Sequence, residues 1–327
     1  MDYNKAFGEN QAFFSKRPFS FFEAVFLVAQ QDKLYHILLF REDFAMRDRF
    51  RTDLASEAFE QLGEEAQALR GASVRRETLF GAPLLAVEIS DEAAAAALGK
   101  PIGRYYTLEL PARPRRASAG FEGLARAAAE LIRRCGVPET GEVLVAALGN
   151  PDITPDALGP LCASQVLATR HLKARDETLW EGFSSVSLCR PGVLGTAGLE
   201  SAEQIRALCA ALRPSLVIVV DALAGAEAAG LCRSIQVCDS GISPGSGVCN
   251  DRGRIDRALL GAPVTAVGVP TVTDAAPFGG DEALRGLFVT PRDIDSAVRD
   301  CARVIAYGID LALHRGLSVD DLDALVG

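Results

Sequence analysis

Hydrophobic and polar positions follow two different spacings along most of this chain. Short, continuous apolar runs are typical of strands that are covered on both faces, and they are separated by stretches in which apolar residues recur every three or four positions, as on one side of a helix. The predicted strands are residues 84–89, 105–110, 143–148, 216–220, 234–237 and 264–269. The predicted helices are residues 92–98, 121–135, 157–171, 201–212 and a last one that runs to about residue 314.

Two of these helices begin with recognisable capping residues. Ser201 is expected to cap the helix that starts there, and Gln204 would complete a capping box. The last helix is expected to start at Thr290, followed by a proline and by Asp293 in the first turn. Strands that alternate with helices predict an α/β protein, built as a three-layer α/β/α sandwich around a largely parallel sheet.

The first 50 residues differ from the rest because they are rich in phenylalanine. The chain has two methionines, Met1 and Met46, and the second lies just before the first recognisable motif. Two interpretations stay open. Either translation starts at Met46 and residues 1–45 are a start-site artefact, or these residues belong to a genuine extended pro-segment.

Composition and charge narrow the classes of function. The 327 residues are 49% hydrophobic and 24% charged, as in an ordinary globular protein, and the net charge of −9 argues against direct binding to nucleic acid. The apolar stretch 19–29 contains Glu23 and is too short for a membrane span, which needs about 20 residues. Without a recognisable leader either, we expect a cytoplasmic protein that does not bind membranes.

Cysteine and histidine give no sign of a metal site. The eight cysteines form no C-x-x-C pair, and the three histidines lie far apart in the sequence. We therefore expect reduced thiols, no metal and no cofactor.

Two aspartates are the strongest candidates for catalysis. Asp156 and Asp221 each follow an apolar run that is predicted to be a buried strand. Because the carboxyl ends of parallel strands open onto a common crevice, the two carboxyl groups could share a proton there and activate a water molecule. The alternative is structural: either aspartate could cap a helix, and Asp221 could instead pair with an arginine.

A glycine-rich loop over residues 238–250 is the second candidate. Its backbone N–H groups could hold a peptide or an oxyanion, and the residues concerned are Gly241, Gly245, Ser246 and Gly247. The loop has neither a Gly-Lys-Ser/Thr ending nor a G-x-G-x-x-G pattern. A long surface turn is the alternative interpretation.

Taken together, these segments resemble the germination protease of spore-forming bacteria. The resemblance runs in the same order over most of residues 51–315. The matching stretches are 51–57, 103–105, 107–109, 148–150, 154–160, 169–171, 191–200, 221–224, 239–250, 270–275 and 289–291. Residues 276–286 depart from it, because they are much shorter than the insertion that relatives carry before the last helix.

The resemblance implies a function. Members of that family are self-processing, aspartic-type endopeptidases, made as inactive tetrameric zymogens, that degrade small acid-soluble spore proteins at germination. It implies Asp156 and Asp221 as the essential pair, a homotetramer in the cytoplasm of the spore core, and small acid-soluble spore proteins as partners. The implied fold is a phosphorylase/hydrolase-like three-layer sandwich related to that of hydrogenase-maturation proteases.

The resemblance also gives meaning to residues 52–57, whose sequence Thr-Asp-Leu-Ala-Ser-Glu matches the context in which the family cuts its substrates. We predict self-cleavage between Asp53 and Leu54, so that residues 1–53 are extension and pro-segment and residues 54–327 form a single catalytic domain. Arg104 and Arg170 are candidates to bind the acidic side chain before the cut, although either could form a structural ion pair instead.

Three other interpretations remain open at this point. The chain could be a metal-guided protease of the hydrogenase-maturation kind. It could be a non-catalytic α/β module whose glycine-rich loops bind phosphate and whose aspartates are only caps. It could also be a catalytically silent relative with a regulatory role.

Overall fold

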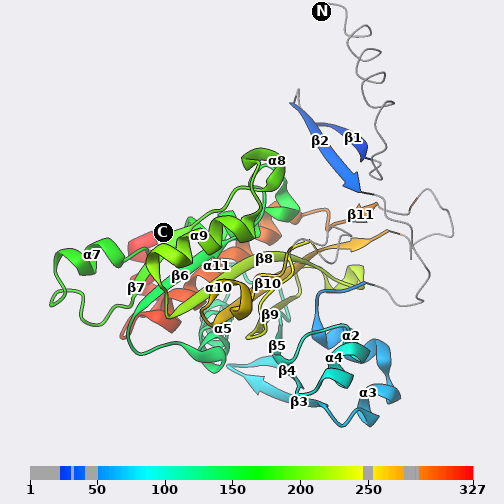
Figure 1. Cartoon of the computed structure of the whole chain (residues 1–327), viewed down its shortest axis with the longest axis horizontal. Coiled ribbons are helices and arrows are strands. Elements are labelled where there is room, and N and C mark those ends of the chain that lie inside the picture. Colours follow the sequence, from blue (N-terminus) through cyan, green and yellow to red (C-terminus); the bar gives the residue numbers. More distant parts are fainter. Residues whose placement is uncertain are drawn as a thin grey trace, which may run out of the picture. The chain divides into compact units, whose positions relative to one another are not determined.

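The computed structural model describes the backbone of residues 23–30 and 33–40 and, with side chains except that of residue 67, residues 51–245, 253–275, 284 and 287–326 (Figure 1). The chain forms two compact units, residues 1–47 and 48–327. In the first, β1 (Glu23–Gln30) pairs antiparallel with β2 (Lys33–Phe40). The domain boundary at residue 53 stays a prediction. Among the described residues, no helix combines the length and the apolar character needed to cross a bilayer.

The second unit is built on one large sheet. Its strands are β3 (Ala72–Leu79), β4 (Ala82–Ile89), β5 (Gly103–Glu109), β6 (Glu142–Ala147), β7 (Ser185–Cys189), β8 (Leu216–Ala224), β9 (Ser234–Cys238), β10 (Val264–Asp274) and β11 (Phe288–Val289). They lie in the order β3-β4-β5-β9-β10-β8-β6-β7, with β11 paired to β10. The ladders among β7, β6, β8 and β10 are parallel, whereas β9, β5, β4 and β3 continue the sheet in antiparallel pairs.

Helices cover both faces of this sheet (Figure 1). Those described are α2 (Ala55–Leu62), α3 (Glu64–Ala68), α4 (Glu92–Leu98), α5 (Phe121–Gly136), α6 (Leu158–Ala163), α7 (Arg170–Arg175), α8 (Leu194–Ala197), α9 (Ser201–Leu212), α10 (Arg257–Leu260), α11 (Ile294–Leu313) and α12 (Val319–Val326), with 3-10 turns η1 (Thr154–Asp156) and η2 (Ala228–Gly230).

Alternate residues of the central strand show how the layers form. On β8, Leu216, Ile218 and Val220 pack with α5, α6 and α11, while Val217 and Val219 face the opposite side and pack with α9 and α10. The helices α2 and α4 share this second face, over β4, β5 and β9. The predicted α/β sandwich is therefore confirmed, and its sheet is parallel over β7, β6, β8 and β10.

The helix predicted over residues 157–171 is wrong, because two short helices, α6 and α7, replace it. The chain leaves the helical path between them since the backbone N–H of Leu167 donates to the buried carboxyl group of Asp310 on α11. The backbone N–H of Thr169 then donates to the carbonyl oxygen of Val186 on β7, 3.0 Å away. Tertiary hydrogen bonds have overridden the helical pattern here.

The bounds of α9 are as predicted, but its capping residues are not. The N-cap is Glu200, whose backbone N–H donates to the Glu203 carboxylate at 3.3 Å. Ser201 and Gln204 instead donate to the carbonyl oxygen of Gly192, at 3.2 and 3.0 Å, and so hold the preceding loop.

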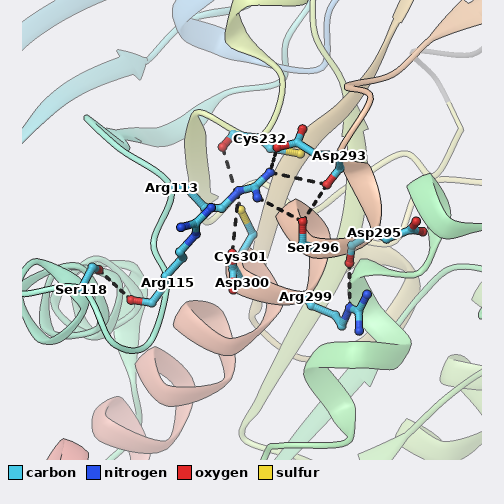
Figure 2. Close-up of polar contacts among 10 residues, drawn as sticks. All are labelled: Arg113, Arg115, Ser118, Cys232, Asp293, Asp295, Ser296, Arg299, Asp300 and Cys301. Carbon is cyan, nitrogen blue, oxygen red and sulfur yellow. Dashed lines mark hydrogen bonds and ion pairs between the residues drawn. The ribbon is translucent and has the colours of Figure 1, made fainter.

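The N-cap of α11 lies three residues later than predicted. Thr290 donates from Oγ1 to the carbonyl oxygen of Thr271 on β10, and the N-cap position is taken by Asp293. The Asp293 carboxylate pairs with Arg113, which also donates to Ser296 Oγ at 3.0 Å (Figure 2). This contact joins the segment that follows β5 to the start of α11.

Candidate active site

Asp221 is part of a polar row that crosses one face of the sheet. It lies opposite Gly268 of β10, which in turn lies opposite Gln236 of β9, and Gln236 lies opposite Thr107 of β5. Directly paired residues project from the same face of a sheet, so the side chains of Asp221, Gln236 and Thr107 share the face that carries α2 and α9. We call these three residues the polar row. All three are buried.

Glycine separates the first two members of the polar row. A Cβ atom at Gly268 would come within 2.6 Å of Leu223 Cγ and 2.9 Å of the Asp221 carbonyl oxygen, so no larger residue fits there without movement. Adjacent strands are about 4.8 Å apart, which puts the Cα atoms of Asp221 and Gln236 about 10 Å apart. The side chain that lies over Gly268 is that of Leu223 on β8, because a Cβ atom there would also come within 2.8 Å of Leu223 Cδ1.

Asp156 lies beside the strand that carries Asp221. The strand β6 pairs with β8, and the backbone N–H of Leu148 continues the ladder by donating to the Val220 carbonyl oxygen at 2.8 Å. The loop that follows then folds back, so that the backbone N–H of Asn150 donates to Asp156 Oδ2 at 2.8 Å. The turn η1, which ends in Asp156, contacts both β8 and β10. Asp156 thus lies by the carboxyl ends of these strands.

The loop depends on one glycine. Gly149 has a φ of +114°, and a Cβ atom there would lie 1.9 Å from the carbonyl oxygen of Asp156 and 3.3 Å from its Oδ1. Asp156 does not cap the helix that follows it, because the N-cap of α6 is Ala157 and makes no side-chain capping bond. The carboxyl group of Asp156 instead holds the loop after β6.

The segment Thr52–Glu57 lies against the polar row and the end of β8. Asp53 pairs with Ala224, three residues beyond Asp221: the Asp53 backbone N–H donates to the Ala224 carbonyl oxygen, and the Ala224 N–H donates to Asp53 Oδ2, both at 2.8 Å. Gln236 Nε2 donates to the carbonyl oxygen of Asp53 at 3.1 Å, and the N–H of Ala55 donates to Gln236 Oε1 at 2.7 Å.

Further contacts fix the two ends of this segment. Thr107 Oγ1 donates to Ser56 Oγ at 3.1 Å, and Lys100 Nζ donates to the carbonyl oxygen of Thr52 at 2.8 Å. Burial lowers the pKa of Lys100, an effect that the nearby carboxylate of Asp53 opposes. Burial also raises the pKa of Glu57, which accepts hydrogen bonds from the Ala226 N–H and from Thr52 Oγ1.

Both candidate arginines form ion pairs. Arg104 Nε lies 2.7 Å from Asp239 Oδ2, and this hydrogen bond raises the pKa of the guanidinium. Arg170 Nε lies 3.3 Å from an oxygen of Glu142, the first residue of β6, and so at the opposite end of that strand from Asp156. Both arginines are thus held in ion pairs, and the role in substrate binding stays a prediction.

The glycine-rich loop, residues 238–250, begins at the carboxyl end of β9. Cys238, the last residue of β9, lies opposite Ala266, two positions before Gly268 along β10, so the loop leaves the sheet on the amino-terminal side of the polar row. Gly241 has a φ of +84° and approaches the Ile255 carbonyl oxygen, which a Cβ atom would meet at 2.3 Å. Gly245 also has a positive φ, of +75°. Ser246 and Gly247 lie outside the described residues.

Sequence reasoning missed Gln236 and Lys100. Gln236 interrupts the apolar run of β9, and a buried amide in a strand is a signal that could have been noticed. Lys100 follows the C-cap of α4 and looks like an ordinary surface residue in the sequence. Within the described part of the chain, no group of three or more His, Cys, Asp or Glu side chains could hold a metal ion.

Comparison with known proteins assigns the family. The family described as germination protease matches residues 51–284. The chain is 36% identical to a germination protease of Caldanaerobacter subterraneus subsp. tengcongensis over 84% of its own length and 98% of that protein, and 32% identical to one of Bacillus cereus over 84% and 96%.

A third relative is the germination protease of Clostridium perfringens, at 34% identity over 72% of this chain and 86% of that protein. Among solved structures, the chain is similar to the nickel–iron hydrogenase maturation protease HycI of Thermococcus kodakarensis, with 19% identity and a TM-score of 0.31 over 54% of this chain and 98% of that one. From the extent of the match and the identity of these relatives, the chain belongs to the germination protease family of peptidases.

Proposed function

We propose that this protein is a two-aspartate endopeptidase that first cuts itself between Asp53 and Leu54 and then degrades small acid-soluble spore proteins during germination. One observation carries the proposal. The peptide bond with the expected cleavage context lies over the same face of the sheet as Asp221, and Asp53 is hydrogen-bonded to the strand that carries Asp221, three residues beyond it.

The chemistry needs one proton shared between two carboxyl groups. The ionised member of the pair Asp156 and Asp221 takes a proton from a water molecule, whose oxygen attacks the carbonyl carbon of Asp53. The protonated member donates to the carbonyl oxygen and stabilises the charge that develops there. When the tetrahedral intermediate collapses, the C–N bond to Leu54 breaks, the carboxyl group that took the proton from water passes it to the leaving amine, and the other carboxyl group keeps or regains its own proton. Hydrolysis is then complete without a redox step.

The contacts of Asp53 support a preference for an acidic residue before the cut. Its carboxylate accepts from the Ala224 N–H, and Lys100 supplies a buried positive charge close by. A hydrogen bond from a backbone N–H and a nearby cation both favour an ionised side chain over a neutral one. Lys100 and Ala224 therefore take the role that the sequence suggested for Arg104 and Arg170. The homotetramer and the location in the spore core stay predictions.

The test compares two variants with a nearby control. Purified full-length protein is incubated, and intact mass and amino-terminal sequence are followed over time. We expect wild type to yield a product that begins at Leu54, and Asp156→Asn and Asp221→Asn to remain uncut. Asp152→Asn is the matched control, because Asp152 is an exposed acid in the same loop as Asp156. It should process at the wild-type rate.

Two results would refute the proposal. One is a wild-type product that begins at another residue or never forms. The other is normal processing by both asparagine variants at positions 156 and 221. A synthetic peptide with the sequence Thr-Asp-Leu-Ala-Ser-Glu, supplied to wild type after processing, tests cleavage of other chains. The matched peptide with asparagine in place of the aspartate should be cut more slowly.

A further inference from the structure

We propose that Gln236 holds the peptide bond to be cut, and that its amide N–H stabilises the oxygen of the scissile carbonyl group. This inference rests on the proposed function, because it takes the Asp53–Leu54 bond as the one that is hydrolysed. Gln236 reaches both sides of that bond: its Nε2 donates to the Asp53 carbonyl oxygen at 3.1 Å, and its Oε1 accepts from the Ala55 N–H at 2.7 Å.

These two hydrogen bonds determine how the amide lies. Because the Ala55 N–H can only donate, the amide oxygen must face it, which turns the NH₂ group toward the carbonyl oxygen of Asp53. A side chain that both donates and accepts in one plane is needed here, and the planar amide of glutamine provides both groups. The hydrogen bond from the Ala55 N–H therefore determines that the NH₂ group of Gln236 points toward the Asp53 carbonyl oxygen.

The contacts involve only the backbone of the bound segment. A carbonyl oxygen and the N–H two residues further along are the groups that a neighbouring strand would pair with, so the Gln236 side chain acts as a strand partner for this segment. Any substrate that binds with the same backbone course would make the same two bonds, whatever its side chains. Gln236 can thus serve the chain's own segment and other polypeptides alike.

The position of Gln236 in the polar row relates it to Asp221. The two residues face the same side of the sheet, on either side of Gly268, over which the Leu223 side chain of β8 lies. The carbonyl oxygen bound by Gln236 becomes negatively charged in the tetrahedral intermediate, and a hydrogen bond to it becomes stronger at that moment. The contribution of Gln236 should therefore appear in the rate of the chemical step.

The test replaces the amide and keeps the size of the side chain. Gln236→Met removes both bonds, and we expect self-cleavage of the full-length chain to slow by about 100-fold, as when one oxyanion donor is lost from a protease. Gln165→Met is the matched control: it makes the same change at an amide that accepts from Arg303 Nε and donates to the Leu161 carbonyl oxygen, beside α6 and α11 on the other face of the sheet. It should process at close to the wild-type rate, with folding of both variants checked by circular dichroism and thermal unfolding.

A second variant separates catalysis from folding. Gln236→Glu keeps the length and the acceptor for the Ala55 N–H, but its carboxylate has no hydrogen to offer the carbonyl oxygen. It should be slow near neutral pH and should recover relative to wild type as the pH falls toward about 4.3, where a glutamate regains a proton. Packing of residue 236 against the segment, without a donated hydrogen bond, would not produce such a recovery.

The outcomes distinguish this inference from the proposed function. If wild type does not cut at Asp53–Leu54, the proposed function fails and takes the inference with it. If wild type cuts there and Asp221→Asn does not, but Gln236→Met cuts as fast as Gln165→Met, only the role of Gln236 is refuted. A Gln236→Glu variant whose rate relative to wild type is independent of pH would also refute it.

Discussion

The position of Asp156 depends on the absence of a side chain at Gly149, so Gly149→Ala should impair processing. A Cβ atom would stand 1.9 Å from the carbonyl oxygen of Asp156, whereas real Cβ contacts are not shorter than 3.0 Å. The turn that carries Asp156 must therefore move by about 1.1 Å. A misplacement of about 1 Å at a catalytic group costs about 100-fold in rate, so we expect self-cleavage to slow by about that factor.

The same substitution also strains the backbone, and this effect needs its own control. Gly149 has a φ of +114°, where an alanine costs about 1–3 kcal/mol. Gly136, at the end of α5, has a φ of +108°, and no other atom lies within 4 Å of the point where its Cβ atom would stand. Gly136→Ala therefore carries a similar backbone strain without a collision and without contact to the site.

The assay measures the half-time of cleavage between Asp53 and Leu54 by intact mass, together with the free energy of unfolding in urea. Both variants should lose stability, and Gly149→Ala should lose more because of the collision. Only Gly149→Ala should lose activity well beyond its loss of folded protein. If the two variants cut equally fast, the close approach of Gly149 to Asp156 does not position a catalytic group.

Two further predictions concern a buried pair on α11. Asp310→Asn should leave the free energy of unfolding at pH 7 unchanged or raise it, because burial already raises the pKa of Asp310 and an amide oxygen still accepts from the Leu167 N–H. Asp310→Ala leaves that N–H unpaired and should lower the free energy of unfolding by about 1–3 kcal/mol. Equal denaturation midpoints for the two variants would contradict this. Burial lowers the pKa of His314 from 6.5 to about 4, so the unfolded chain takes up a proton first as the pH falls through this window and the folded state loses stability. Relative to His314→Phe, wild type should lose about 3 kcal/mol of its free energy of unfolding between pH 7 and pH 4, and parallel pH profiles of the two proteins would refute this prediction.

The apolar pattern predicted much of the fold because most strands are buried on both faces. The runs that became β6, β8 and β10 are continuous for this reason. The edge strand β3 was missed, since its exposed and half-buried positions alternate and it carries Arg75, Arg76 and Glu77. It is joined to β4 by a turn in which Phe80 and Gly81 both have positive φ, and a phenylalanine is an uncommon residue for that conformation.

The candidate site was predictable only where a residue follows its own strand. Asp156 and Asp221 were singled out in this way, because an apolar run precedes each of them, although β8 runs on to Ala224 and Asp221 lies within it. Gln236 could not be linked to the segment it binds, since 183 residues separate it from Asp53 and no local pattern reports such a pairing. The ion pairs of the two candidate arginines were also out of reach of the sequence, because partners such as Asp239, 135 residues from Arg104, become visible only in the folded chain.

The hydroxyl group of Thr52 bridges two groups that a cut would release. It accepts from the backbone N–H of Leu54 at 3.0 Å and donates to the carboxylate of Glu57. After hydrolysis at Asp53–Leu54, Thr52 departs with the fragment, and the amide of Leu54 becomes an ammonium ion next to a carboxylate that no longer accepts from Thr52. The new chain end and Glu57 could then neutralise each other, and that attraction would work against rejoining of the two pieces, so that the proposed self-cleavage would proceed in one direction.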